Sequence, residues 1–282
     1  AYAAYMAKQM LAEKGIDIKV VTTLHGTDIT LVGSHPNYKT AVEFSINNSD
    51  VVTSVSNNLK ETTNRLFSIR KEIKVVYNFI DVVKYNNASN EECMRSSIAA
   101  PEEKILTHVS NFRPVKRVED VVAIFAKVNK IIPSKLIMIG EGPETIKAKS
   151  LAKKLGVFDK IFFLGNSDEV AKILCYTDIF LLPSQTESFG LAALEAMAVS
   201  TAVISTNTGG LPEVNIDGVT GYLSNLGDID DMAKNAISIL KEEKVLQRFK
   251  ENAKKHANKF ALKNILPVYE EIYNSCCKAK VN

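Results

Sequence analysis

Short apolar runs of strand length alternate with helical patterns along almost the whole chain, and this alternation restricts the fold more than any other feature. Most runs are rich in valine, isoleucine and leucine at successive positions, as in strands buried on both faces. Since a helical pattern follows each run, we predict an α/β fold with doubly wound parallel sheets. The expected strands are residues 16–24, 50–54, 73–77, 104–110, 135–139, 161–164, 179–182 and 202–205.

These strands form two series separated by a polar segment at 84–92. The segment is rich in asparagine and has no apolar period, so we expect a linker there. Two Rossmann-like domains, 1–90 and 91–258, should then face each other, with a ligand at the carboxyl ends of the strands. The chain starts in an amphipathic pattern, which suggests that the first portion of the first domain precedes residue 1.

Length, charge and cysteine content exclude several classes of protein. With 282 residues and a net charge of +3, the chain has room for two medium domains and too little charge to suggest nucleic acid as a partner. No apolar run approaches the roughly 20 residues that a membrane span needs. The four cysteines show neither metal-ligand spacing nor a disulfide framework, which predicts a reducing, cytoplasmic environment.

Two glutamates bracket the start of an expected helix directly after the strand at 179–182. Glu187 lies in the loop and Glu195 inside the helix, eight positions on, which is at most roughly 12 Å of helical rise. Between them, the backbone N–H groups of residues 189–191 open the helix, where a phosphate binds well. A solvated helix face is the ordinary alternative. Glu195, however, stands among apolar and small residues, where a buried carboxylate needs a partner.

A cationic loop follows the strand at 104–110. In the run Ser-Asn-Phe-Arg-Pro-Val-Lys-Arg, Arg113, Lys116 and Arg117 fall within five positions. An arginine fork and a lysine point charge at a strand end suit a diphosphate, and such cations stabilise charge that grows on a leaving group. An ordinary charged loop before a helix is an equal alternative.

A histidine with small polar neighbours ends the first strand, in the run Thr23-Leu-His-Gly-Thr-Asp28. His25 could donate a hydrogen bond to a sugar hydroxyl, and Thr23, Thr27 and Asp28 could meet an acceptor. A structural role is equally open. We expect the other histidines to be structural.

Two glycine-rich strand-to-helix turns, 140–144 and 208–213, are weaker signals. The first opens like a dinucleotide fingerprint, but Thr145 stands where the third glycine belongs, which disfavours an NAD-dependent oxidoreductase. Tight turns explain both runs as well as ligand loops do. Nothing in the sequence matches a P-loop, a Ser-His-Asp arrangement or a metal site.

Together these motifs resemble the retaining glycosyltransferases of family 4, which have the GT-B architecture. The matching runs are Glu-Ser-Phe-Gly-Leu-Ala-Ala-Leu-Glu-Ala-Met-Ala from Glu187, Gly-Glu-Gly-Pro from Gly140, Phe-Leu-Gly from Phe163, Gly-Gly-Leu-Pro-Glu from Gly209, and the loop with Arg113 and Lys116. They follow the family's order over 104–225. Within the family, residues 24–30, 78–81 and 110–117 are similar to members that transfer N-acetylglucosamine (GlcNAc) to L-malate.

The resemblance implies a role for each motif residue. It implies that Glu187 and the segment Ser188, Phe189, Gly190 and Leu191 hold hydroxyls of the transferred sugar, and that Glu195 binds the ribose. Lys116, with Arg113 and Asn111, would bind the diphosphate, and Gly165 and Asn166 would flank the uracil. His25 would contact the sugar, which makes His25, Lys116 and Glu187 the expected catalytic residues.

The implied reaction is transfer of GlcNAc from UDP-GlcNAc to L-malate with retained configuration, the first step of bacillithiol biosynthesis in bacteria. It needs no metal and no cofactor besides this donor. Two alternatives stay open: a family 4 enzyme with a lipid or polysaccharide acceptor, and a non-catalytic UDP-sugar-binding module. The sequence leaves both a monomer and a homo-oligomer open.

The comparison with the family also shows two departures. Many members carry an arginine where Asn111 stands, so the diphosphate contacts are expected to be shared differently here. The first glycine-rich loop of the family and much of its acceptor pocket are expected to precede residue 1. The last segment, 259–282, is expected to form a helix that crosses back to the first domain.

Overall fold

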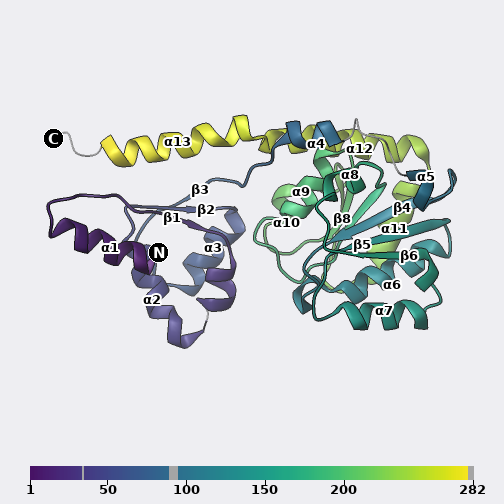
Figure 1. Cartoon of the computed structure of the whole chain (residues 1–282), viewed down its shortest axis with the longest axis horizontal. Helices are drawn as coiled ribbons and strands as arrows, with labels where there is room; N and C mark the ends of the chain where they lie inside the picture. The colour runs from purple at the N-terminus through teal and green to yellow at the C-terminus, as the bar shows by residue number, and fades with distance from the viewer. Residues whose placement is uncertain (34, 89–94, 279–282) are drawn as a thin grey trace. The chain divides into compact units, whose positions relative to one another are not determined.

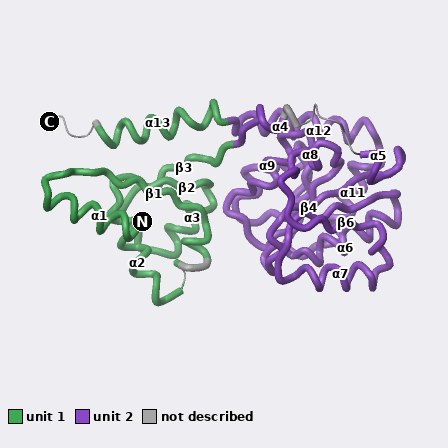
Figure 2. The backbone as a smooth tube through the Cα atoms, in the orientation of Figure 1, with its two compact units in different colours: residues 1–79, 262–282 green, residues 80–261 purple. Residues whose placement is uncertain are grey.

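The computed structural model describes residues 1–33, 35–88 and 95–278. The chain forms two compact units, shown in different colours in Figure 2. Unit 1 comprises Ala1–Phe79 and Leu262–Asn282, and unit 2 comprises Ile80–Ala261. Residues 80–88 thus group with unit 2, whereas the sequence analysis had assigned them to the first domain. The expected boundary at residue 90 lies outside the described residues.

Unit 2 is built on a six-stranded sheet in the order β6-β5-β4-β7-β8-β9, with every pair of neighbours parallel. The order runs outward in one direction from β4 and in the other from β7, as in a doubly wound Rossmann sheet. The predicted fold class, α/β with parallel sheets, is confirmed. The strands are β4 (Lys104–Val109), β5 (Ser134–Ile139), β6 (Ile161–Gly165), β7 (Ile179–Leu182), β8 (Ala202–Thr206) and β9 (Gly221–Ser224).

Helices cover both faces of this sheet, which explains why its strands read as unbroken apolar runs (Figure 1). On β4, Leu106 packs in the core cluster that includes Phe125 of α6, and the neighbouring Ile105 packs in the cluster of Ile173 of α8. Full burial of a side chain such as Phe125 contributes about 1.5–3 kcal/mol. The helices are α5 (Arg95–Ile98), α6 (Val118–Asn129), α7 (Thr145–Lys154), α8 (Val170–Cys175), α9 (Leu191–Ala198), α10 (Leu211–Val214), α11 (Ile229–Leu240) and α12 (Glu243–Ala257).

Unit 1 contains a three-stranded parallel sheet in the order β1-β2-β3. The last helix of the chain, α13, belongs to this unit and buries Ile265 and Ile272 against Val76. None of the helices in the described part of the chain is long and apolar enough to cross a bilayer. The elements are α1 (Tyr2–Ala12), β1 (Val21–Leu24), the π-helical turn η1 (Asp28–Val32), α2 (Pro36–Asn47), β2 (Val51–Ser54), α3 (Asn57–Leu66), β3 (Ile73–Val75) and α13 (Leu262–Lys278).

The first predicted strand is too long. Strand β1 begins at Val21, not at residue 16, because its partner β2 begins at Val51, directly opposite Val21. The carbonyl of Val20 still accepts the N–H groups of Asp50 and Val51, and the regular ladder of β1 starts one residue later.

The predicted linker at 84–92 is wrong over its first part. Residues Val82–Ala88 form helix α4, although the run is rich in asparagine. The carboxylate of Asp81 accepts the N–H groups of Val83 and Lys84 at 3.1 and 3.2 Å, and α4 packs against α8 and α9. A cap and tertiary packing thus override weak helix propensity. Residues 89–92 lie outside the described residues.

Candidate active site

The carboxyl ends of β4 and β7 lie side by side at the point where the strand order of unit 2 reverses. Ligands of doubly wound sheets bind in the crevice at such a point, because the loops after the two strands lead away in opposite directions. The loop after β4 carries Arg113 and Lys116, and the loop after β7 carries Ser184 and Glu187. Two motifs that lie far apart in the sequence therefore belong to neighbouring strand ends.

Backbone hydrogen bonds fix the loop after β4. Its 3-10 turn, Pro114–Lys116, forms as the N–H of Lys116 donates to the carbonyl of Arg113 at 2.8 Å. The N–H of Gln185, in the loop after β7, donates to the carbonyl of Val115 at 2.8 Å. Because this bond joins the two loops, the side chains that follow are held in register with each other.

Two residues with side chains adopt positive φ values at the ends of this turn, Phe112 at 39° and Arg117 at 51°. Such conformations are uncommon outside glycine, and they persist where the surroundings hold them. The side chain of Arg117 bonds Asp120, and Arg113 is exposed. Of the three cations in the loop, Lys116 is the one directed at the acid of the neighbouring loop.

Lys116 and Glu187 form an ion pair with 2.5 Å between Nζ and Oε1. The buried hydroxyl of Ser184 donates to the same carboxylate oxygen at 2.9 Å. Both charged side chains are largely shielded, with 22% of Lys116 and 14% of Glu187 exposed, so their attraction is screened less than that of a surface pair. The arrangement presents an oriented positive charge beside a hydrogen-bond acceptor group.

Glycines allow close backbone contact around this pair. A Cβ at Gly209 would overlap the carbonyl oxygen of Glu187, and a Cβ at Gly140 would overlap that of Ser110. Both glycines have positive φ, which a residue with a Cβ adopts only under strain. The glycine-rich turns therefore hold the functional loops in place through packing.

The segment after Glu187 leads into α9 as the sequence predicted. Gly190, with a φ of 100°, precedes the helix, and its carbonyl accepts the N–H of Leu194. Phe189 is buried, with its ring edge-on to that of Phe260 at 5.6 Å. Ser188 is half-buried and Leu191 is exposed. The first N–H groups of a helix have no partner within it, so this turn is suited to bind an anion or a hydroxyl oxygen.

Glu195 lies on α9 and is partly buried, in line with its apolar surroundings in the sequence. The hydroxyl of Tyr85 on α4 donates a hydrogen bond to its carboxylate. Burial raises the pKa of Glu195, while the hydrogen bond from Tyr85 and the charge of Lys84 act in the opposite direction. Glu195 therefore has the hydrogen-bond partner that a partly buried carboxylate requires.

His108 is fully buried beneath the loop after β4. Its Nδ1 lies 2.8 Å from the carbonyl oxygen of Leu181, and its Nε2 lies 2.8 Å from Oγ of Ser110. Since a carbonyl only accepts, Nδ1 carries the proton and Nε2 accepts from the serine. Burial lowers the pKa of His108 to about 4, and the charge of Lys116 acts in the same direction. A neutral ring thus ties β4 to β7 beneath the candidate site.

A pocket of about 360 Å³ lies at the carboxyl ends of β4, β5 and β6. Asn111 and Asn166, both predicted site residues, line it together with Ser110 and Asp168. The predicted Gly165 ends β6 beside it with a φ of 69°, and its carbonyl accepts the N–H of Gly140 at 2.7 Å. Of the two residues expected to flank the base, Asn166 thus lines the hollow and Gly165 precedes it, while Asn111, expected to contact the diphosphate, lines the same hollow.

In unit 1, the predicted residues lie at the end of β1. His25 and Thr27 are exposed. The carboxylate of Asp28 accepts the N–H of Gly26 at 2.8 Å, which closes the turn. Of these three side chains, Asp28 is the one with a hydrogen bond to the backbone, and none of the three has an ion-pair partner among the described residues.

A pocket of about 280 Å³ in unit 1 is lined by Thr23 and Asp28, with Tyr38 of α2 on its border. The hydroxyl of Thr23 accepts a hydrogen bond from Thr53 at 2.9 Å. Among the described residues that line this pocket, none is lysine or arginine. Its walls offer hydroxyls, apolar surface and the carboxylate of Asp28.

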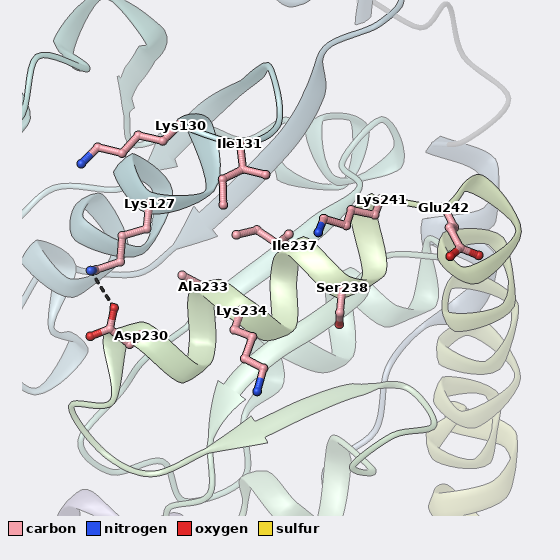
Figure 3. Close-up of a pocket in the computed structure, with 10 residues that line it drawn as sticks. All are labelled: Lys127, Lys130, Ile131, Asp230, Ala233, Lys234, Ile237, Ser238, Lys241 and Glu242. Carbon is pink, nitrogen blue, oxygen red and sulfur yellow. Dashed lines mark ion pairs between the residues drawn. The ribbon is translucent and has the colours of Figure 1, made fainter.

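A larger pocket, of about 820 Å³, lies between α6 and α11 (Figure 3). Lysines surround an apolar floor that includes Ile131 and Ile237, and Lys127 pairs with Asp230 at 2.7 Å. The hollow is formed by helix faces, and the predicted site residues do not line it. We therefore do not identify this pocket with the predicted site, although it is larger than the pocket at the strand ends.

Within the described ranges, no group of three histidine, cysteine, aspartate or glutamate side chains is arranged to hold a metal ion. The charged groups predicted for the site are Lys116 and Arg113 in the loop after β4, Glu187 in the loop after β7, and Glu195 on α9. They are suited to bind anions and hydroxyl groups.

Two residues of this region, Ser184 and Tyr85, were not predicted from the sequence, whereas His108 was expected to be structural and is fully buried. Ser184 directly follows the proline that ends a predicted strand, a position that could have signalled a role. His108 stands in an apolar strand, where a polar side chain requires a partner. Tyr85 falls in the polar run assigned to a linker, and nothing in the sequence indicated its contact with Glu195.

Comparison with known proteins places these observations in context. A family profile described as glycosyl transferases group 1 matches residues 89–256, and one described as glycosyltransferase family 4 matches residues 1–84. The N-acetyl-alpha-D-glucosaminyl L-malate synthase of Bacillus anthracis is 44% identical over 274 residues, which cover 97% of this chain and 71% of that enzyme.

Solved structures agree with the chain in fold. Sucrose-phosphate synthase from Thermosynechococcus elongatus is similar with a TM-score of 0.82 at 21% identity, over 99% of this chain and 73% of that one. HepE of Anabaena in complex with UDP is similar with a TM-score of 0.84 at 20% identity, over 98% and 77% of the two chains. At this level of identity the similarity concerns the fold alone.

Proposed function

We propose, since this chain belongs to glycosyltransferase family 4, that it transfers GlcNAc from UDP-GlcNAc to the hydroxyl of L-malate with retention of configuration. The observation that carries the donor half is the ion pair of Lys116 and Glu187 where the strand order of unit 2 reverses. The acceptor half rests on the 44% identity with the Bacillus anthracis synthase over nearly the whole chain.

The donor is bound along the strand ends of unit 2 in this proposal. The uracil lies beside Asn166 in the pocket at the ends of β4, β5 and β6, Asn111 of the same pocket faces the diphosphate, and the ribose hydroxyls donate to the carboxylate of Glu195. Lys116 and the exposed Arg113 meet the diphosphate, whose negative charge suits both cations. Glu187 and the helix start at residues 189–191 hold the sugar hydroxyls.

Transfer exchanges one bond at the anomeric carbon. The bond from this carbon to the diphosphate oxygen breaks, and a bond to the malate hydroxyl oxygen forms on the same face of the sugar. The proton of that hydroxyl passes to the departing phosphate oxygen. Negative charge grows on the diphosphate as it leaves, and an oriented Lys116 stabilises that charge more in the transition state than in the ground state.

The ion pair suggests how the site changes when the donor binds. Lys116 and Glu187 are partners in the structure, and the hydroxyl of Ser184 shares the same carboxylate oxygen. A bound diphosphate takes over the ammonium group, while Ser184 keeps Glu187 in place. The second carboxylate oxygen of Glu187 then accepts from a sugar hydroxyl.

A different acceptor is the second candidate, and one observation favours it. The pocket at the end of β1 is lined by apolar and hydroxyl side chains and by the carboxylate of Asp28, with neither lysine nor arginine among its described lining residues, whereas a dicarboxylate prefers cations. An uncharged or lipid-linked hydroxyl suits such walls better. UDP release and product analysis with different acceptors separate the two candidates.

The decisive experiment measures UDP release from UDP-GlcNAc by the full chain with L-malate, with D-malate and without acceptor, in buffer containing EDTA. We expect release to depend on L-malate, and the product to be an α-linked GlcNAc-malate by mass spectrometry and proton NMR. Release that is independent of malate but stimulated by lipid vesicles would favour the second candidate. UDP binding without turnover on any acceptor would contradict an enzymatic role.

A further inference from the structure

Helix α4 lies at the first residues of unit 2 and is fastened at its start. The N–H of Ile80 donates to the carbonyl of Phe260 at 2.9 Å, and Asp81 caps the first turn of the helix. The helix packs against α8 and α9. A side chain on α4 that faces α9 is therefore held by a cap, a backbone bond and helix packing at once.

Tyr85 is the residue of α4 that reaches the second acid of the candidate site. Both Tyr85 and Glu195 are partly buried, and the tyrosine hydroxyl donates to the carboxylate. Burial and the neighbouring negative charge raise the pKa of Tyr85, so the hydroxyl keeps its proton and remains a donor. The other group on α4 that acts on Glu195 is the cation Lys84.

A carboxylate has two oxygens with about four positions for hydrogen-bond donors. One donor from Tyr85 fixes the torsion of the Glu195 side chain and leaves acceptor positions for two adjacent hydroxyls. A free glutamate would lose rotamer freedom each time it bound a diol, whereas a held one has lost it already. The tyrosine thus prepares the acid for a ligand with neighbouring hydroxyl groups.

We propose that Tyr85 is a positioning residue for donor binding, which holds the Glu195 carboxylate in the orientation that accepts both hydroxyls of the donor ribose. The inference rests on the proposed function and deepens it, because it makes part of the affinity for the nucleotide depend on α4.

The test compares UDP with 2′,3′-dideoxy-UDP as ligands of the full chain and of Tyr85→Phe, by titration calorimetry. Loss of one hydrogen bond to a charged group is expected to weaken UDP binding about 10-fold. Binding of the dideoxy ligand should change less than about 2-fold, since it has no hydroxyls for Glu195 to accept. In steady-state assays the KM for UDP-GlcNAc should rise while kcat stays nearly constant.

Two further variants separate positioning from a general structural effect. In a Glu195→Ala background, Tyr85→Phe should have almost no additional effect on UDP affinity, because the group it positions is gone. Tyr273→Phe, at an exposed tyrosine of α13, serves as the control and should bind UDP like the parent chain.

The outcomes distinguish this inference from the proposed function. If the parent chain binds no UDP, both are overturned. If it binds UDP, and Tyr85→Phe weakens UDP and its dideoxy analogue equally, only the role of Tyr85 is overturned. An unchanged affinity of Tyr85→Phe for UDP overturns it as well.

Discussion

Polar side chains at the end of β1 in unit 1 are held differently from those at the ends of β4 and β7 in unit 2. In unit 2, Lys116 and Glu187 are paired at 2.5 Å and lie mostly out of solvent. In unit 1, His25 and Thr27 are exposed, and the pocket at the end of β1 is lined by the carboxylate of Asp28 and by hydroxyl and apolar side chains, with no lysine or arginine among its described lining residues. The comparison shows that the paired and shielded charges lie in the loops after β4 and β7, where the diphosphate is proposed to leave. The other unit offers hydroxyls with weaker constraints.

The largest effect is expected from removing the cation of the ion pair. Lys116→Ala should lower kcat for UDP release by about 10²–10³, the size seen when one preorganised donor to a developing charge is lost. Steady-state kinetics with UDP-GlcNAc measure it. Lys130→Ala, at an exposed lysine of the same unit, is the control and should leave kcat for UDP release unchanged. A similar loss in both variants would show that general positive charge, and not the oriented pair, assists the reaction.

A smaller effect is expected from loosening the backbone beneath the pair. Gly209 and Gly218 both have positive φ, but a Cβ meets the carbonyl of Glu187 at the first and open space at the second. Gly218→Ala should lower the free energy of unfolding by about 1–2 kcal/mol for its conformation alone. Gly209→Ala should lower the free energy of unfolding by this amount and by about a further 1–3 kcal/mol, because its Cβ overpacks against the backbone. It should also weaken UDP binding. Denaturant unfolding and calorimetry test this, and equal effects in the two variants would contradict it.

The next effect concerns pH. The carboxylate of Glu195 can accept two hydroxyls only when ionised, and burial raises its pKa against the opposing effects of Tyr85 and Lys84. UDP affinity should therefore be highest at pH values above the raised pKa of Glu195. It should fall as the pH drops through this pKa, by at most about 10-fold per pH unit, because one proton is taken up. Calorimetry across the acidic range measures it. Glu195→Gln should show only the pH dependence of UDP itself, and an unchanged profile in this variant would exclude Glu195 as the titrating group.

The smallest effect is expected in unit 1. Thr23→Val removes a hydroxyl from the pocket at the end of β1 and should raise the KM for L-malate about 2- to 5-fold, the size of one neutral hydrogen bond. UDP affinity should stay the same, since the donor contacts belong to unit 2. Thr40→Val, at an exposed threonine of α2, is the control. A change in UDP affinity on replacing Thr23 would contradict the proposal that unit 2 binds the donor and unit 1 the acceptor.

The sequence was sufficient for the family and the fold class, which are both confirmed. Buried parallel strands are visible as apolar runs because both of their faces lie in the core. The assigned roles of Lys116, Glu187 and Glu195 stay predictions, although the structure brings the first two together. Tyr85 could not be predicted, because its contact with Glu195 depends on how α4 packs on α9. Asp81 caps α4, but periodicity alone does not reveal a short capped helix in an asparagine-rich run.

The salt bridge of Lys116 has a consequence for the competition between ligands. An anion that binds Lys116 must first displace the carboxylate of Glu187 from the ammonium group. Its net binding free energy is therefore only the difference between its own attraction to Lys116 and that of Glu187. Inorganic phosphate, which has no further groups to offer, gains little from such an exchange. In the proposed binding mode, a nucleotide that also fills the pocket of Asn166 and reaches Glu195 gains much more, so abundant simple anions would compete only weakly with it.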